Sequence, residues 1–155
     1  MRAIHQFVAG FANGDAISNE ARVLAGVFRS WGCASEIYCE KKRTLPELRQ
    51  QIRDVGDACA SIGTDDIVVL HLSIGSVVND VFASLPCRKA IIYHNVTPPS
   101  WFSFVNRQTA VLLERGMEQV AALARAAPVC MADSGYNAKE LEQLGYRDVR
   151  VLPLV

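Results

Sequence analysis

The sequence has no excess of charge of either sign. Its 155 residues include 16 lysines and arginines and 16 aspartates and glutamates, so the formal net charge is zero. Because no positive field exists to hold a phosphate backbone, we do not expect nucleic-acid binding. The chain also lacks an apolar run of about 18 residues, which a membrane span needs, and it lacks a signal-peptide pattern. We expect a cytoplasmic protein without a transmembrane segment, for which a peripheral membrane contact stays open.

Paired cysteines and metal-binding motifs are missing as well. The chain has five cysteines, an odd number, and none of them form a C-x-x-C pair, so we interpret them as buried thiols in a reducing compartment. We see no cluster with the spacing of metal ligands and expect no bound metal. Asp65 and Asp66 precede a strand signal, so they fall at the sheet edge opposite the one where ligands bind.

Apolar segments, by contrast, are plentiful. Hydrophobic residues make up 50% of the sequence, enough for one buried core, and neither repeats nor linkers divide it. We therefore expect a single domain over residues 1–155. Short apolar runs predict strands at 4–9, 35–38, 67–70, 90–93, 129–132 and 149–152. Helical patterns lie between them at 17–31, 45–52, 77–82, 106–126 and 137–144.

This alternation predicts an α/β fold, a Rossmann-like, doubly wound and mainly parallel sheet with helices on both faces. Helix-start signals include possible capping boxes of Thr44 with Glu47 and of Asn137 with Glu140. Gly145 is placed to end the last helix in a left-handed conformation. In the segment 106–126 a helical apolar face is predicted from Leu113, Met117, Val120 and Ala124.

In open α/β sheets, ligands bind beyond the carboxyl ends of the strands, where helices begin and offer free N–H groups. Four loops of small and polar residues follow predicted strands in this way. They cover residues 10–15, 71–76, 94–97 and 133–135. We expect the ligand site to be built from them.

The first of these loops lacks the G-x-G-x-x-G spacing of dinucleotide-binding sites. Gly14 would let a diphosphate come close to the helix that follows. The alternative is that Asn13 and Gly14 form a plain turn and that Asp15 only caps the helix. The sequence leaves both interpretations open.

Two other loops have similarly modest interpretations. Ser76 either caps the next helix or faces a ligand, and His71 fits a core histidine with satisfied hydrogen bonds. Ser134 precedes Gly135 at a strand-to-helix turn, but the motif is not G-x-S-x-G, so it does not predict a nucleophile. Ser134 is interpreted as a cap or a phosphate contact.

His94 is the strongest candidate for a functional side chain. It ends the strand at 90–93, because Pro98 and Pro99 cannot continue the hydrogen-bond ladder. Asn95 and Thr97 supply hydrogen-bonding groups beside it. Next along the chain, an apolar surface for a ligand is offered by Trp101, Phe102 and Phe104. A purely structural role for His94 stays open.

Taken together, the loops resemble the amino-terminal half of group 1 (family 4) glycosyltransferases, and the resemblance covers essentially the whole chain. The segments that carry it are Gly14-Asp15-Ala16-Ile17-Ser18-Asn19, His71-Leu72-Ser73-Ile74-Gly75-Ser76, Tyr93-His94-Asn95-Val96-Thr97-Pro98 and Ala132-Asp133-Ser134-Gly135-Tyr136-Asn137, with Val151-Leu152-Pro153 at the end.

The resemblance implies the GT-B fold, two Rossmann-like halves with the active site between them. It also implies retaining transfer from a nucleotide-diphosphate sugar to an acceptor, with no cofactor and no metal. It assigns His94 a catalytic role, in which the ring hydrogen-bonds or orients the transferred sugar, and it assigns Gly14 to the donor diphosphate. Weaker assignments to substrate binding fall on Asp15, Ser73, Asn95, Thr97 and Ser134.

The family's carboxyl-terminal half, with its E-x7-E motif and its basic nucleotide-binding residues, is not among these residues. We therefore expect the chain alone to be inactive and to need that domain as its partner. Two alternatives remain: half of a GT-B sugar-nucleotide epimerase or phosphorylase, and a nonenzymatic α/β module that binds a ligand or partner through its exposed aromatic residues.

Overall fold

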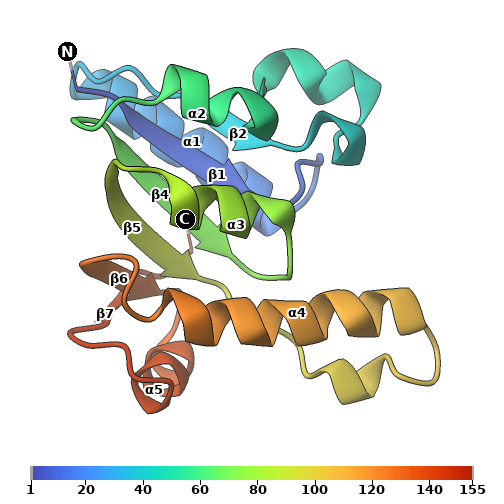
Figure 1. The fold of residues 1–155 in the computed structure, drawn as a ribbon. Helices are drawn as coiled ribbons and strands as arrows, with labels where there is room; N and C mark the ends of the chain where they lie inside the picture. The colour runs from blue at the N-terminus through green and yellow to red at the C-terminus, as the bar shows by residue number, and fades with distance from the viewer. Residues whose placement is uncertain (1, 155) are drawn as a thin grey trace.

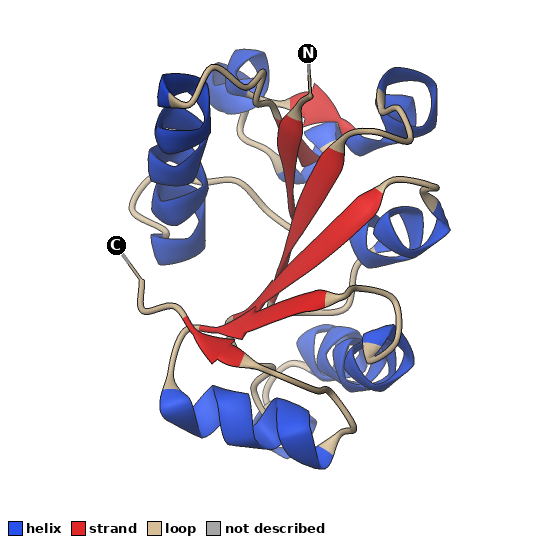
Figure 2. Cartoon of the chain, turned by 90° about the vertical axis from the view of Figure 1, so that its left-hand side faces the viewer, coloured by secondary structure: helices blue, strands red, loops and turns tan. Residues whose placement is uncertain are grey.

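The computed structural model describes residues 2–154 and shows a sheet covered by helices on both faces (Figures 1 and 2). Every pair of neighbouring strands is parallel, and the strand order is β3-β2-β1-β4-β5-β6-β7. The strands are β1 (Ile4–Val8), β2 (Ile37–Cys39), β3 (Arg53–Asp54), β4 (Ile67–Leu72), β5 (Arg88–Tyr93), β6 (Val129–Ala132) and β7 (Arg150–Val151).

Five α-helices and four short 3₁₀ helices connect these strands in the described part of the chain. The α-helices are α1 (Ala16–Ser30), α2 (Ala58–Ser61), α3 (Val77–Ser84), α4 (Arg107–Leu123) and α5 (Gly135–Gln143). The 3₁₀ helices are η1 (Lys41–Arg43), η2 (Pro46–Gln51), η3 (Val55–Asp57) and η4 (Pro99–Trp101). Figure 2 shows α1 on one side of the sheet and α3 and α4 on the other.

Separate apolar clusters fill the two faces. On the side of α3 and α4, Leu70 and Leu72 of β4 pack with Phe82 and Val120. On the side of α1, Ala21 and Ala25 pack with Val8 and Ile37 from neighbouring strands. Since both faces are covered, β4 and β5 contain near-continuous apolar runs, as expected for central parallel strands.

The predicted fold class is confirmed, and all six predicted strands are present. A seventh, β3, was missed because it has only two residues and no apolar pattern. The segment predicted as a helix at 45–52 is the 3₁₀ helix η2. The four-residue α2 was also missed.

Both predicted capping boxes are wrong. The Thr44 hydroxyl donates to the Glu40 carbonyl instead, and η2 begins after Leu45 without a side-chain cap. The helix α5 starts two residues earlier than expected, so Ser134 is its cap and Asn137 lies inside it. Gly145 does adopt the predicted left-handed conformation, with φ of 92°.

Two burial expectations need correction. In α4, Met117 is 36% exposed, whereas Gly116 and Gln119 are buried, because α3 and the loop after β4 approach the helix on that side. Among the cysteines, only Cys39 and Cys130 are buried and Cys59 is exposed, although all five are free thiols.

No helix in residues 2–154 is both long and apolar enough to cross a membrane.

Candidate functional site

The direction of chain progression reverses between β1 and β4, which lie side by side in the sheet. From β1 the chain moves outward to β2 and β3, and from β4 it moves outward the other way. The loops after these two strands therefore diverge and leave a crevice, which is where open α/β sheets bind ligands. A cleft of about 490 Å³ lies there, and its lining includes Gly10, Phe11, Asp15, Arg43, Ser73 and Ile74.

The loop after β1 forms one wall of this cleft. The Asp15 carboxylate accepts hydrogen bonds from the backbone N–H and the hydroxyl of Ser18, at 2.8 and 2.6 Å, and so caps α1. Gly14 adopts a φ of +74°, which favours glycine. The interpretation of Asp15 as an N-cap is thus confirmed, and its side chain is at the same time part of the cleft.

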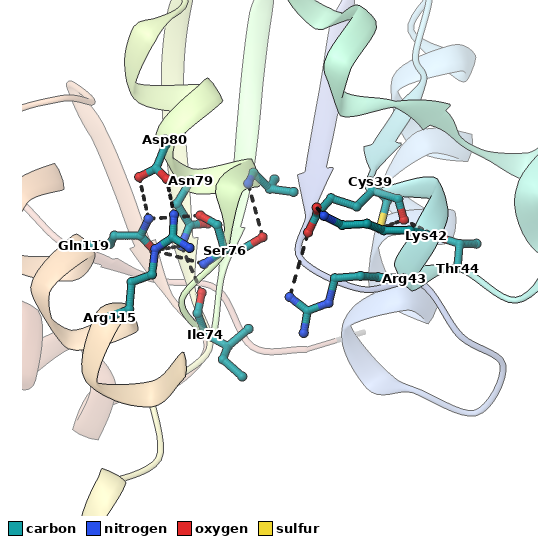
Figure 3. Close-up of polar contacts among 12 residues, drawn as sticks. Cys39, Lys42, Arg43, Thr44, Ile74, Ser76, Asn79, Asp80, Arg115 and Gln119 are labelled. Carbon is teal, nitrogen blue, oxygen red and sulfur yellow. Dashed lines mark hydrogen bonds and ion pairs between the residues drawn. The ribbon is translucent and has the colours of Figure 1, made fainter. Parts of the chain in front are cut away.

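The loop after β4 forms the facing wall and is anchored by Gln119 of α4 (Figure 3). The Gln119 amide donates to the Ser76 carbonyl and to Asp80, and it accepts from the Ser76 N–H and from Asn79. The Ser76 hydroxyl accepts from the Val78 N–H and caps α3, as predicted. Ser73, half-buried at the cleft, is held in place by this anchored loop.

Behind the cleft, three side chains form a buried chain of hydrogen bonds. Gln6 of β1 lies 3.0 Å from His71 Nε2 through its Oε1 atom. His71 Nδ1 lies 3.0 Å from His94 Nε2. His71 is fully buried and the His94 side chain is 2% exposed, so the sheet edge encloses both rings.

The two imidazoles meet edge to edge rather than face to face. Their planes differ by only 7°, and their centroids are 5.2 Å apart while the facing nitrogens are 3.0 Å apart. The nitrogens therefore lie between the rings, nearly in one plane. This is the arrangement of an N–H···N hydrogen bond.

Glu20 of α1 completes the cluster. Its Oε2 atom lies 3.4 Å from His94 Nε2 and 3.6 Å from His71 Nδ1, and the side chain is 1% exposed. Neither carboxylate oxygen has a hydrogen-bond partner. The sequence does carry a signal that could have found it, because Glu20 falls on the apolar side of α1, in the i, i+3, i+4, i+7 series of Ile17, Ala21 and Leu24.

On its outer side, His94 faces the loop after β6. Its Nδ1 atom is 3.7 Å from Asp133 Oδ2 and has no hydrogen-bond partner. Burial and the neighbouring His71 lower the pKa of His94 to about 4, although Glu20, Asp133 and Asp15 act in the opposite direction. The His94 ring is therefore neutral near pH 7.

The three groups Glu20, His71 and His94 have the residue types of a metal site and bring one ligand atom each within 4.8 Å of the others. The ring orientation does not suit an ion, however. Because the two imidazoles lie edge to edge, their facing nitrogens point at each other and not at a common centre. The geometry fits a hydrogen-bonded cluster.

The segment after His94 is shaped by Tyr93 and Asn95. The Tyr93 hydroxyl accepts from the Val96 N–H at 3.1 Å and donates to Glu140 at 3.0 Å, and burial raises the pKa of that hydroxyl. Asn95 has a positive φ of 73°, which turns the chain away from β5. Thr97 follows and is half-buried.

Beyond Thr97, Trp101 is 72% exposed and Phe104 is 99% exposed, whereas Phe102 packs against the core. Figure 1 shows this segment, in yellow before α4, extending past the sheet.

The sequence-predicted site residues thus share one edge of the sheet but belong to different local settings. Asp15 and Ser73 line the cleft, and Gly14 lies in the loop that forms its wall. His94 is enclosed behind that wall with His71 and Glu20. Ser134 accepts from the Asn137 N–H and caps α5, which confirms its interpretation as a cap. Gln6, Glu20 and Gln119 were missed.

No protein-family model matches the sequence, and no curated protein matches it either.

Proposed function

We propose that this chain is the amino-terminal half of a retaining glycosyltransferase with the GT-B fold. In this proposal the whole enzyme transfers a sugar from a nucleotide-diphosphate donor to an acceptor, and the donor-binding half lies outside these residues. The observation that carries the proposal is the cleft at the reversal point between β1 and β4. Its walls are two of the loops whose sequences resemble that family.

The chemistry of the cleft supports a partial site for a phosphorylated ligand. Gly14 has no neighbour within 4 Å of an added Cβ, so the backbone there is open to a close approach. Arg43 lines the cleft and brings a positive charge to it. Its Nη1 atom also lies 4.0 Å from Glu40 Oε2. One partly paired arginine supplies little of the positive charge that a leaving diphosphate needs, which fits the requirement for a second half.

The proposed role of His94 is positional in this half. Its backbone N–H donates to the Leu72 carbonyl at 2.9 Å, so β4 fixes the position of the His94 backbone. Because its ring is enclosed, contact with a sugar requires the neighbouring loops to shift when the two halves close around the donor. We place Asp133 beside it as a further polar wall of the interdomain site.

Binding of the donor tests the proposal directly. We expect UDP-sugars or GDP-sugars to bind weakly to the chain in ligand-observed NMR, and Ser73→Trp to abolish that signal by filling the cleft. Ser30→Trp, at the exposed far end of α1, is the matched control and keeps the signal.

Activity tests the assignment to transfer. The polypeptide that includes the residues encoded after Val155 is incubated with the same donors, and nucleoside diphosphate release is measured. His94→Ala lowers the rate at least tenfold in the proposed enzyme. Absence of donor binding by both polypeptides, or a Ser73→Trp variant that binds normally, contradicts the proposal.

The exposed aromatic residues favour a second candidate function, a binding module for another protein. Trp101 is 72% exposed and Phe104 is 99% exposed, and exposed apolar patches often mark protein-binding surfaces. If this segment docks a second copy of the chain, the chain sediments as a dimer or larger species. Trp101→Ser then restores the monomer without unfolding. A chain that is monomeric both as wild type and as Trp101→Ser contradicts this second function.

A further inference from the structure

The buried carboxylate of Glu20 is the least satisfied polar group of the site. It is 1% exposed, and neither oxygen accepts a hydrogen bond. The facing nitrogens of His71 and His94 lie 3.6 and 3.4 Å from its Oε2 atom. An ionised carboxylate in this position is strongly destabilising unless a hydrogen or a positive charge is directed at it.

Gln6 determines where the hydrogens of the histidine pair lie. Its amide nitrogen donates to the Ala21 carbonyl at 2.8 Å, which directs its Oε1 atom toward His71 Nε2. Since Oε1 only accepts, His71 Nε2 must carry a hydrogen. In a neutral His71 ring, the Nδ1 atom is then an acceptor.

The hydrogen of His94 is fixed in turn. With His71 Nδ1 accepting, the 3.0 Å contact between the rings requires a hydrogen on His94 Nε2. The other tautomer of His94 would bring two lone pairs together at that distance. With both rings neutral, the His71 Nε2–H donates to Gln6 and the His94 Nε2–H donates to His71. No ring hydrogen is then directed along a bond to Glu20.

One additional proton resolves this conflict. If Glu20 holds it, the buried carboxyl group is uncharged. If a ring holds it, an imidazolium pairs with the Glu20 carboxylate. We propose that Glu20, His71 and His94 hold one shared proton at neutral pH, so that the cluster is uncharged, and that Glu20 is a positioning residue whose carboxyl group keeps this proton beside the histidine pair.

The charged groups around the cluster are consistent with a proton held there. Asp133, after β6, faces His94 Nδ1 at 3.7 Å, and Asp15, at the start of α1, also acts on His94. Both are carboxylates, whereas Gln6 on β1 is uncharged. The inference goes beyond sugar transfer and does not depend on it.

The number of protons that the cluster holds can be measured from the pH dependence of folding stability. Above about pH 7.5 an unfolded chain has ionised glutamate and neutral histidines. The folded cluster would then hold one proton more than the same groups in the unfolded chain. The contribution of this cluster therefore lowers the folding equilibrium constant tenfold for each unit by which the pH rises. Glu20→Gln removes the shared proton and therefore this dependence, while it keeps the shape of the side chain.

We compare wild type, Glu20→Gln and the control Glu114→Gln by urea unfolding between pH 7.5 and 9. Glu114 is exposed on α4, so this control makes the same chemical change away from the cluster. The inference requires that the ratio of the folding equilibrium constants of wild type and Glu20→Gln change tenfold per pH unit, and that the control parallel wild type. Parallel curves for wild type and Glu20→Gln overturn it.

A second measurement uses the wild-type protein alone, should Glu20→Gln fail to fold. With only three histidines in the chain, ¹⁵N NMR of the ring nitrogens and ¹³C NMR of the Glu20 carboxyl group locate every proton of the cluster. A carboxylic acid or an imidazolium at pH 8 supports the inference. An ionised Glu20 beside two neutral rings overturns it, and so does a stoichiometric divalent metal ion detected by elemental analysis.

Discussion

Gly75 and Gly116 pack backbone against backbone. An added Cβ at either position would lie 2.8 Å from the backbone nitrogen of the other, and the Gly75 N–H donates to the Leu112 carbonyl at 3.0 Å. Because Gly75 lies in the loop after β4 and Gly116 lies in α4, this contact holds one wall of the cleft against the helix. The absence of both side chains is what allows the approach.

We expect Gly75→Ala to destabilise the protein by about 1–3 kcal/mol, as overpacking does. The new Cβ would lie 2.3 Å from the Leu112 carbonyl oxygen, which belongs to the backbone and cannot rotate away. Urea unfolding measures the loss. The control is Gly26→Ala, an exposed position in α1 with open space around it, which we expect to gain about 0.5–1 kcal/mol. Equal stability of the two variants would contradict the packing argument.

Gln119→Leu tests the polar anchor of the same loop. The substitution removes all four hydrogen bonds of the Gln119 amide and leaves Asn79 and the Ser76 backbone without those partners. We expect a loss of about 2–3 kcal/mol in the free energy of unfolding. Gln108→Leu, at an exposed position of α4, should change it by no more than about 0.5 kcal/mol. A tolerated Gln119→Leu would show that the network contributes little.

Tyr93→Phe tests the turn that follows β5. Without the hydroxyl, the buried Val96 N–H and the Glu140 carboxylate each lose a partner, so we expect a cost of about 1–2 kcal/mol. Amide hydrogen exchange at Val96 should accelerate more than exchange in β5. Tyr136→Phe serves as the control, because Tyr136 is 76% exposed. Unchanged exchange at Val96 would argue against this role.

The buried His94 gives the protein a specific sensitivity to acid. Its pKa is about 4 in the folded protein and 6.5 in an unfolded chain, so the unfolded state binds the extra proton more readily. The stabilising contribution is present in full above pH 6.5 and is lost as the pH falls from 6.5 toward 4, by about 3 kcal/mol in all. Chemical unfolding at a series of pH values in this window measures it.

His94→Gln is the comparison for this prediction, since the glutamine amide still donates to His71 but does not titrate. The stability difference between wild type and His94→Gln should narrow as the pH falls through the window. A His5→Gln variant checks specificity, because burial also lowers the pKa of His5. The His5→Gln variant should keep the loss of stability between pH 6.5 and 4 that we attribute to His94.

Local patterns were enough to predict the longer strands and helices and several of their ends. Asp15, Ser76 and Ser134 were each interpreted as a cap or a ligand contact, and all three are caps. The capping role was predictable because an N-cap depends only on the residues within one turn. The two capping boxes failed for a related reason. Ser134 is a competing cap a few residues earlier, and Thr44 finds a better acceptor in the Glu40 carbonyl.

The site was predictable only in outline. The alternation of strands and helices placed His94 and the three other loops at one edge of a parallel sheet. Glu20 and Gln6 were missed because their role depends on helix α1 crossing over β1 and β4, which brings residues far apart in sequence within 4 Å. The contact of Gly75 with Gly116 was missed for the same reason.

The sequence by itself determined an α/β fold with a parallel sheet, because hydrophobic periodicity and helix-end signals act over a few residues. It also determined that His94 stands at the carboxyl edge, since the two prolines that soon follow it exclude a longer strand. Only the tertiary structure decided that His94 is enclosed between Glu20, His71 and Asp133, with the open cleft beside it. Those neighbours come from α1, β4 and the loop after β6, and the packing that joins them is non-local.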